Sequence, residues 1–181
     1  VPVPLHLKEE NDFSFTGDEL APLITDKTRM IFLNFPSNPT GGVATQAQLE
    51  GIAKVIKEKC HPNVRIYSDE IYEYICFDGD KNLSIASIDG MREKTIVVSG
   101  TSKTFAWTGG RMGWAVFPTV EEARFFKNLN INLFSCVPPY NQEAAAVALT
   151  APEMGDEVGE MVRTFENRRD IVVKGLNEID G

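Results

Sequence analysis

Short apolar runs alternate along the chain with amphipathic segments, a pattern typical of strands and helices that follow one another. The apolar runs that predict buried strands cover residues 30–33, 64–67, 95–99 and 113–117, and a weaker alternation predicts a first strand over residues 1–7. Helical spacing predicts helices that start at Thr16 and Thr45 and helices over residues 120–133, 140–149 and 153–179. This order predicts an α/β fold with a mostly parallel sheet covered by helices.

The length and composition narrow the classes of function. A chain of 181 residues suits one domain, or one domain with part of another. The net charge of -8, without a run of Lys or Arg, argues against a nucleic-acid binder. The three cysteines are widely spaced and only two histidines are present, so we expect no metal site and a reducing, cytoplasmic setting. No apolar stretch approaches the length needed to cross a bilayer, so we expect no membrane contact.

Polar clusters follow three of the predicted strands, directly after Leu33, Tyr67 and Val98. In an open parallel sheet, binding sites form beyond the carboxyl ends of the strands. We therefore expect the three clusters to serve one pocket.

The most informative cluster contains Lys103, which follows a strand in a loop of small and hydroxylated residues. For a Ser-Lys pair alone, a surface lysine in a turn is the better explanation. Arg111, framed by glycines eight residues later, changes that judgement. Small residues let the backbone approach a ligand closely, and an arginine offers a planar fork to a phosphate. An amine with a phosphate-binding guanidinium is suited to a phosphorylated aldehyde cofactor.

The other two clusters supply groups that such a cofactor uses. Asp69 has a structural alternative as a strand-end or capping carboxylate, but beside a pyridine nitrogen it would keep the ring protonated. Tyr72 would then donate to the phenolic oxygen of the ring, whereas Glu70 alternates to the opposite side and receives no role. Asn38, in Asn38-Pro39-Thr40-Gly41, is a common turn signal by itself and a candidate contact to the same oxygen in company with the others.

Taken in order, the motifs N-P-T-G, D-E-x-Y and S-K-x-F-A-x-x-G-x-R-x-G resemble the class I and II aminotransferases of the aspartate aminotransferase superfamily. The resemblance implies a three-layer α/β/α large domain of pyridoxal 5'-phosphate (PLP) fold type I. It implies a Schiff base between Lys103 and PLP, and a pairing of Asp69 with the pyridine nitrogen. Tyr72 and Asn38 would contact the phenolic oxygen, and Arg111 would hold the phosphate. Lys103, Asp69 and Tyr72 are thus the expected catalytic residues.

The resemblance also implies ping-pong transamination between an amino acid and a 2-oxo acid, in a homodimer. Residues 1–150 would form a PLP-binding large domain, incomplete at its N-terminal side, and residues 151–181 a long helix leading towards a small domain. The family often has a phosphate-binding serine three residues before the lysine, where this chain has Gly100. Thr101 and Ser102 are both open as substitutes.

Two other functions remain open, because the same core supports PLP-dependent β-lyases and synthases, and also non-catalytic ligand-binding modules. In addition, the family's glycine-rich phosphate loop, ring-stacking aromatic and carboxylate-binding arginine are expected outside these 181 residues. We therefore expect the chain by itself to fold without transaminating.

Overall fold

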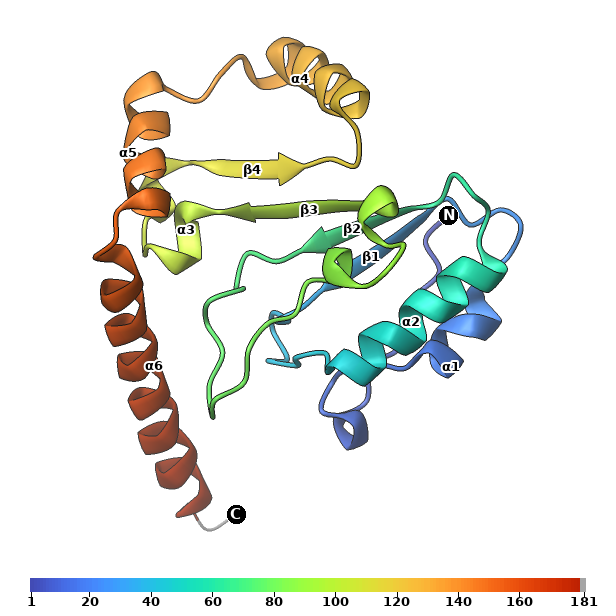
Figure 1. The fold of residues 1–181 in the computed structure, drawn as a ribbon. Coiled ribbons are helices and arrows are strands. Elements are labelled where there is room, and N and C mark those ends of the chain that lie inside the picture. Colours follow the sequence, from blue (N-terminus) through green and yellow to red (C-terminus); the bar gives the residue numbers. More distant parts are fainter. Residues whose placement is uncertain (180–181) are drawn as a thin grey trace.

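A four-stranded sheet forms the centre of the protein (Figure 1). The structure is a computed structural model, and it describes residues 1–179. The strands lie in chain order and are β1 Met30–Asn34, β2 Arg65–Asp69, β3 Thr95–Gly100 and β4 Gly113–Val116. β1, β2 and β3 run parallel, and β4 runs antiparallel to β3. The predicted α/β fold with a mostly parallel sheet is confirmed.

The helices connect and cover these strands. The α-helices are α1 Gly17–Leu20, α2 Gln46–Lys59, α3 Thr101–Thr104, α4 Val120–Phe134, α5 Pro139–Thr150 and α6 Met154–Asn177. Short 3₁₀ turns add η1 Glu9–Asn11, η2 Ala21–Leu23, η3 Ile85–Ser87, η4 Arg92–Lys94 and η5 Thr108–Gly110. Figure 1 shows α1 and α2 together on one face of the sheet, with α4 beyond β4 and α6 extending from α5.

The starts of α1 and α2 confirm the predicted caps. Thr16 and Thr45 each form a capping box with the residue three positions later. At α2, the Thr45 hydroxyl accepts from the amide of Gln48 at 3.3 Å, and the Gln48 side chain accepts from the Thr45 amide at 2.8 Å. Such reciprocal bonds satisfy amides that the first helical turn leaves without partners.

The core lies between α2 and the sheet. Leu49, Ile52 and Ile56 of α2 are almost fully buried, as are Leu33 of β1 and Ile66 of β2. The opposite face of β1 carries Phe32, which is 70% exposed. α4 has no buried residue among those described, and several of its large apolar side chains face solvent, including Phe125 and Phe134. Exposed apolar surface of this extent is typical of regions that contact another segment or chain.

Residues 1–7 do not form the predicted first strand, so that prediction was wrong. Pro2 and Pro4 lack the amide hydrogen that a strand needs to pair, and they fall at the centre of the expected alternation. Leu5 and Leu7 nevertheless pack against the core, which accounts for the apolar pattern without a strand.

α6 is tied to the loop that follows β2. Asp78 accepts a bond from Arg169 Nη2 at 2.8 Å and donates its amide hydrogen to Glu166 Oε1 at 2.6 Å. The Arg169 hydrogen bond holds the pKa of the Asp78 carboxyl below its usual value. The guanidinium also lies 5.2 Å from the ring centroid of Phe77. These contacts fix the direction of a helix that is otherwise largely exposed.

The long helix expected over residues 153–179 forms over Met154–Asn177. The last two residues of the predicted second part, 151–181, lie outside the described residues. Across residues 1–179, none of the helices is both long enough and apolar enough to cross a membrane.

Candidate active site

The three polar clusters start from one edge of the sheet. In the strand register, Asn34 pairs with Asp69, and Asp69 pairs with Val98. Since β1, β2 and β3 are parallel, their carboxyl ends lie side by side, and the segments carrying Asn38, Tyr72 and Lys103 leave from that edge.

Tyr72 connects the first and third of these segments. Asn38 Nδ2 donates to Tyr72 Oη at 3.1 Å, although 34 positions separate the two residues in the sequence. Lys103 Nζ lies 5.6 Å from the centroid of the Tyr72 ring, close enough for the ring face to attract its charge. The turn that carries Asn38 is itself held by a bond from the Asn38 amide to Asn34 Oδ1 at 3.0 Å. Tyr72 therefore links three of the five predicted site residues: it is bonded to Asn38, and its ring lies beneath the amine of Lys103.

Asp69 ends β2 beside these residues and is half-buried. Its Oδ1 accepts from the amide of Ile71 at 3.2 Å, a local turn contact common for an aspartate at the end of a strand. Asp69 therefore has the structural role of a strand-end carboxylate. The bond from Ile71 uses Oδ1, and Oδ2 is the oxygen left for a ligand.

Arg111 lies apart from the other four predicted residues in its hydrogen bonding. It follows η5 with a left-handed backbone, φ 50° and ψ 39°, and its Nη1 donates to the Thr108 carbonyl of its own loop at 2.9 Å. The loop is pinned by Asn141 of α5, which donates to the Gly110 carbonyl at 2.7 Å. Gly110 is required here, because a Cβ would lie 2.4 Å from the Trp107 ring.

Close contact between β3 and β4 explains the glycine at position 100. A Cβ on Gly100 would lie 2.8 Å from the Met112 carbonyl oxygen and 3.1 Å from the Gly113 Cα, so a serine there would force the strands apart. Thr101 is fully buried, and its hydroxyl donates to the same Met112 carbonyl at 3.2 Å. Of the two candidate hydroxyls, Thr101 is thus engaged inside the protein, whereas Ser102 is half-buried at the start of α3.

Glu70 and Glu73 flank Tyr72, and neither is among the site residues predicted from the sequence. Glu70 is only 4% exposed, and its Oε1 accepts from the hydroxyls of Ser68 at 2.8 Å and Ser84 at 2.7 Å. Glu73 Oε1 accepts from the Ser99 hydroxyl at 2.8 Å. Burial raises the pKa of the Glu70 carboxyl, and the hydroxyls of Ser84 and Ser68 offset part of that rise. The sequence indicated only that side chains alternate between the two faces of the strand, so that Glu70 lies on the opposite side from Asp69.

The raised pKa of Glu70 predicts a pH-dependent effect of Glu70→Gln. An acid with a raised pKa in the folded state favours folding at low pH, and this contribution is lost as pH rises through the folded-state pKa. The free energy of unfolding of the wild type, minus that of Glu70→Gln, should therefore fall as pH increases from below the ordinary glutamate range to neutrality. Urea unfolding of both proteins across this range measures the difference. A constant or rising difference would contradict it.

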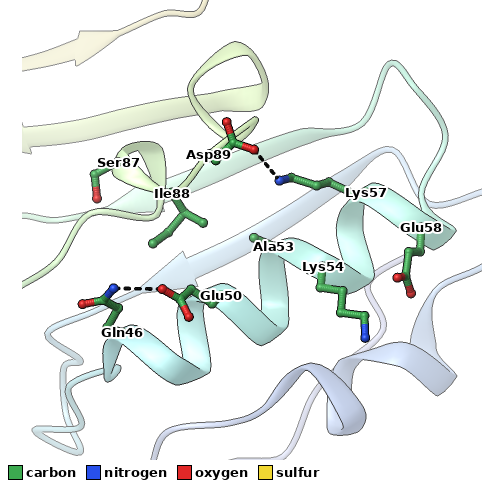
Figure 2. A pocket seen from close by; sticks show the side chains of 9 residues that line it. All are labelled: Gln46, Glu50, Ala53, Lys54, Lys57, Glu58, Ser87, Ile88 and Asp89. Atoms are coloured by element: carbon green, nitrogen blue, oxygen red, sulfur yellow. Dashed lines mark hydrogen bonds and ion pairs between the residues drawn. The ribbon is translucent and has the colours of Figure 1, made fainter.

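A broad, open hollow lies elsewhere, between α2 and η3 (Figure 2). Its lining carries charges of both signs, with Lys57 3.0 Å from Asp89 and Gln46 bonded to Glu50 at 2.8 Å. None of the five predicted site residues lines it. These paired surface charges offer no single binding chemistry, so the strand-end cluster remains the candidate site.

The side chains at the sheet edge fit the groups of PLP. The cofactor's aldehyde needs an amine, its ring nitrogen an anion, its phenolic oxygen a hydrogen-bond donor and its phosphate a cation. Lys103 offers the amine, Asp69 the anion and Tyr72 the hydrogen-bond donor. The amine of Lys103 and the ring of Tyr72 lie next to each other, with Nζ 5.6 Å from the ring centroid. Arg111 offers the fourth from the adjoining loop.

Comparison with known proteins points to one family. The family described as "Aminotransferase class I and II" matches residues 1–181. The chain is 45% identical over 180 residues to "Aromatic-amino-acid aminotransferase 2" of Thermococcus litoralis, covering 98% of this chain and 45% of that protein. It is 41% identical to "Aspartate aminotransferase" of Pyrococcus abyssi, again over 98% of this chain and 45% of that protein. The crystal structure of an aromatic aminotransferase from Pyrococcus horikoshii superposes with a TM-score of 0.88 at 42% identity, covering 98% of this chain and 46% of the other. The chain thus spans about half the length of these relatives.

Proposed function

Because the chain belongs to the class I and II aminotransferases, a family that uses PLP, we propose that the whole protein is a PLP-dependent aminotransferase. It would transfer an amino group between an amino acid and a 2-oxo acid. The observation that best supports this is the meeting of Lys103, Tyr72 and Asn38 at the shared carboxyl edge of the parallel strands. A surface lysine in a turn, the alternative explanation for Lys103, would not need a tyrosine and an asparagine from two other strand ends beside it.

Five side chains are proposed to hold the cofactor. Lys103 binds the aldehyde carbon, Asp69 pairs with the ring nitrogen, and Tyr72 and Asn38 contact the phenolic oxygen. Arg111 binds the phosphate, and the engagement of Thr101 with Met112 makes Ser102 the better candidate for a hydroxyl contact to it. When bound, PLP supplies the electron sink that stabilises negative charge at the substrate α-carbon.

The chain's own contribution is to orient groups and move protons. After the amino group of the amino acid has replaced it at the aldehyde carbon, the freed Lys103 Nζ is proposed to take the proton from the α-carbon of the amino acid and to deliver it to the cofactor's former aldehyde carbon. Asp69 keeps the ring nitrogen protonated while this happens. The same two proton transfers in reverse, on a 2-oxo acid, complete a ping-pong cycle.

Tyr72 is oriented for donation. Its Oη accepts a hydrogen bond from Asn38 Nδ2, so the hydroxyl proton points elsewhere and can be given to a cofactor oxygen. Lys103 Nζ lies 5.6 Å from the centroid of the Tyr72 ring. This short separation supports the proposal that the amine and the phenol bind the same small ligand.

Two other functions are tested by the same assay. A β-lyase or synthase would release pyruvate or ammonia, or form a new bond, without needing a 2-oxo acid acceptor, and a binding module would turn over nothing. The names of the similar proteins favour transamination. Full-length protein with PLP should convert aromatic or acidic amino acids only when a 2-oxo acid is supplied. Turnover that does not depend on the acceptor would replace the proposal with a lyase.

The 181-residue chain prepared alone is proposed to fold but not to transaminate. The family's glycine-rich loop, stacking aromatic and carboxylate-binding arginine are expected in other segments. Arg111 lies exposed and would add little to phosphate binding by itself. Without a fixed substrate orientation, a contribution of up to roughly 7–11 kcal/mol to barrier reduction is lost. Comparable turnover by the purified chain and the full-length protein, in the assay above, would show that the site is complete within these residues.

Three further properties are proposed: the homodimer and the division into domains from the family relationship, and the cytoplasmic location from the wide spacing of the cysteines. The whole protein is a cytoplasmic homodimer with its active sites near the subunit interface. Residues 1–150 belong to the PLP-binding large domain, and residues 151–181 lead towards a second, small domain. A solution mass of one chain for the fully active full-length protein would contradict the dimer.

A further inference from the structure

Glu70 closes the base of the loop that carries Tyr72. Its amide hydrogen goes to the Val98 carbonyl at 2.8 Å, which extends the contact of β2 with β3 by one residue. Its carboxylate is buried and accepts two hydrogen bonds. One comes from the hydroxyl of Ser68, before the loop, and the other from the hydroxyl of Ser84, after it. Both ends of the segment 71–83 are therefore bonded to one buried acceptor atom, Glu70 Oε1, through Ser68 of β2 and Ser84 at the start of η3.

Glu73 gives the same loop a second attachment. Its amide hydrogen bonds the Glu70 carbonyl at 2.9 Å, and its carboxylate accepts the Ser99 hydroxyl at 2.8 Å. Ser99 lies in β3, four residues before Lys103. The turn with Tyr72 at its centre is thus fastened on one side to its own base and on the other to the strand that delivers the lysine.

We propose that Glu70 and Glu73 are positioning residues, which fix the Tyr72 hydroxyl relative to Lys103 through their bonds to Ser68, Ser84 and Ser99. This inference rests on the proposed function of Tyr72 and Lys103. Neither carboxylate touches the cofactor or the substrate in this scheme, and each acts through the place it gives to Tyr72.

The hydrogen bonds, and not the negative charge, carry this effect. Both serine hydroxyls that reach Glu70 go to the same oxygen, Oε1, and Ser99 likewise goes to one oxygen of Glu73. A glutamine retains an oxygen that can accept these bonds, whereas an alanine leaves the serine hydroxyls without this acceptor. Gln and Ala variants at each position therefore separate acceptor from charge.

The test uses full-length protein loaded with PLP. Glu70→Ala and Glu73→Ala should each lower kcat by about 100-fold with little change in KM, the scale expected when a reacting group is displaced by about 1 Å. Glu70→Gln and Glu73→Gln should stay close to the wild type. Glu58→Ala, an exposed position on α2, is the matched control and should not change kcat.

A double-mutant cycle with Tyr72→Phe shows whether the effect passes through Tyr72. In the Tyr72→Phe background, adding Glu70→Ala should change kcat by no more than about twofold, because the contact it positions is already gone. Independent, multiplying effects would overturn the proposal, and so would Gln variants that are as impaired as the Ala variants.

Two readouts do not depend on turnover. The pH midpoint of the absorbance change of the bound cofactor should move in Glu70→Ala in the same direction as in Tyr72→Phe, since both remove the same donor. The affinity of the cofactor-free protein for PLP should fall in both. If Glu70→Ala does not fold, Ser84→Ala and Ser99→Ala remove one attachment each and should show smaller shifts in the same direction.

The outcomes separate this inference from the proposed function. Unchanged cofactor spectra in both Tyr72→Phe and Lys103→Ala would mean that the proposed function itself fails. Expected changes in those two variants, with spectra of the Glu70→Ala, Ser84→Ala and Ser99→Ala proteins identical to the wild type, would overturn only the positioning role.

Discussion

Replacing Lys103 by alanine in the full-length protein should lower turnover by several powers of ten. The change removes the amine proposed to hold the cofactor and the base proposed to carry the proton, so two functions are lost with one side chain. Lys103 lies on α3, directly after β3, and its amine is 5.6 Å from the centroid of the Tyr72 ring. The measurement is kcat with saturating PLP, amino acid and 2-oxo acid.

Lys127→Ala is the matched control, because its side chain is exposed on α4, a helix that bonds the start of β2 through Glu122 and not the carboxyl ends of β1–β3. It should leave kcat unchanged. A Lys103→Ala protein that keeps turnover within about tenfold of the wild type, a loss of only ~1.4 kcal/mol, would show that another group holds the cofactor.

Replacing Asp69 should lower turnover while leaving part of the cofactor binding intact. Lys103 and Arg111 would still hold PLP, but the ring nitrogen would lose the anion that keeps it protonated. Removal of one preorganised electrostatic partner costs about 100- to 1,000-fold in kcat, and we expect Asp69→Ala to fall in that range. Asp26→Ala, in an exposed turn before β1, is the control.

Asp69→Asn distinguishes an electrostatic role from the local structural one. The asparagine keeps an oxygen that can accept from the Ile71 amide, which is the turn contact seen in the structure. It lacks the negative charge, so turnover should fall as it does in Asp69→Ala. Near-normal turnover of Asp69→Asn, with a loss confined to Asp69→Ala, would assign Asp69 to the turn and not to the ring nitrogen.

The sequence predicted the strands well where apolar runs were compact and bounded by turn-forming residues. β1 and β2 formed within two residues of the expected limits, and α2 started at the predicted Thr45 cap. Residues 1–7 failed because alternation alone ignores hydrogen bonding, and two prolines there remove the donors that a strand requires. An apolar face can pack against a core without pairing in a sheet.

The candidate site was predictable as far as it follows from strand ends. The convergence of the segments with Asn38, Tyr72 and Lys103 follows from parallel strands and needs no knowledge of side-chain contacts. The contacts of Glu70 could not be predicted, because alternation shows which side it faces but not that Ser84, fourteen positions later, bonds to it. Such a contact depends on the path of the loop, which local patterns do not determine.

The most direct test of Lys103 as the cofactor-binding lysine is to locate the cofactor bond chemically. Full-length protein with PLP is treated with borohydride, which reduces the linkage between cofactor and lysine to a stable one, and is then digested and mapped by mass spectrometry. We expect the pyridoxyl group on the peptide that contains Lys103. Its presence instead on Lys127 of α4, or on Lys94, whose amine donates to the Pro62 carbonyl at 2.7 Å, would contradict the assignment of Lys103.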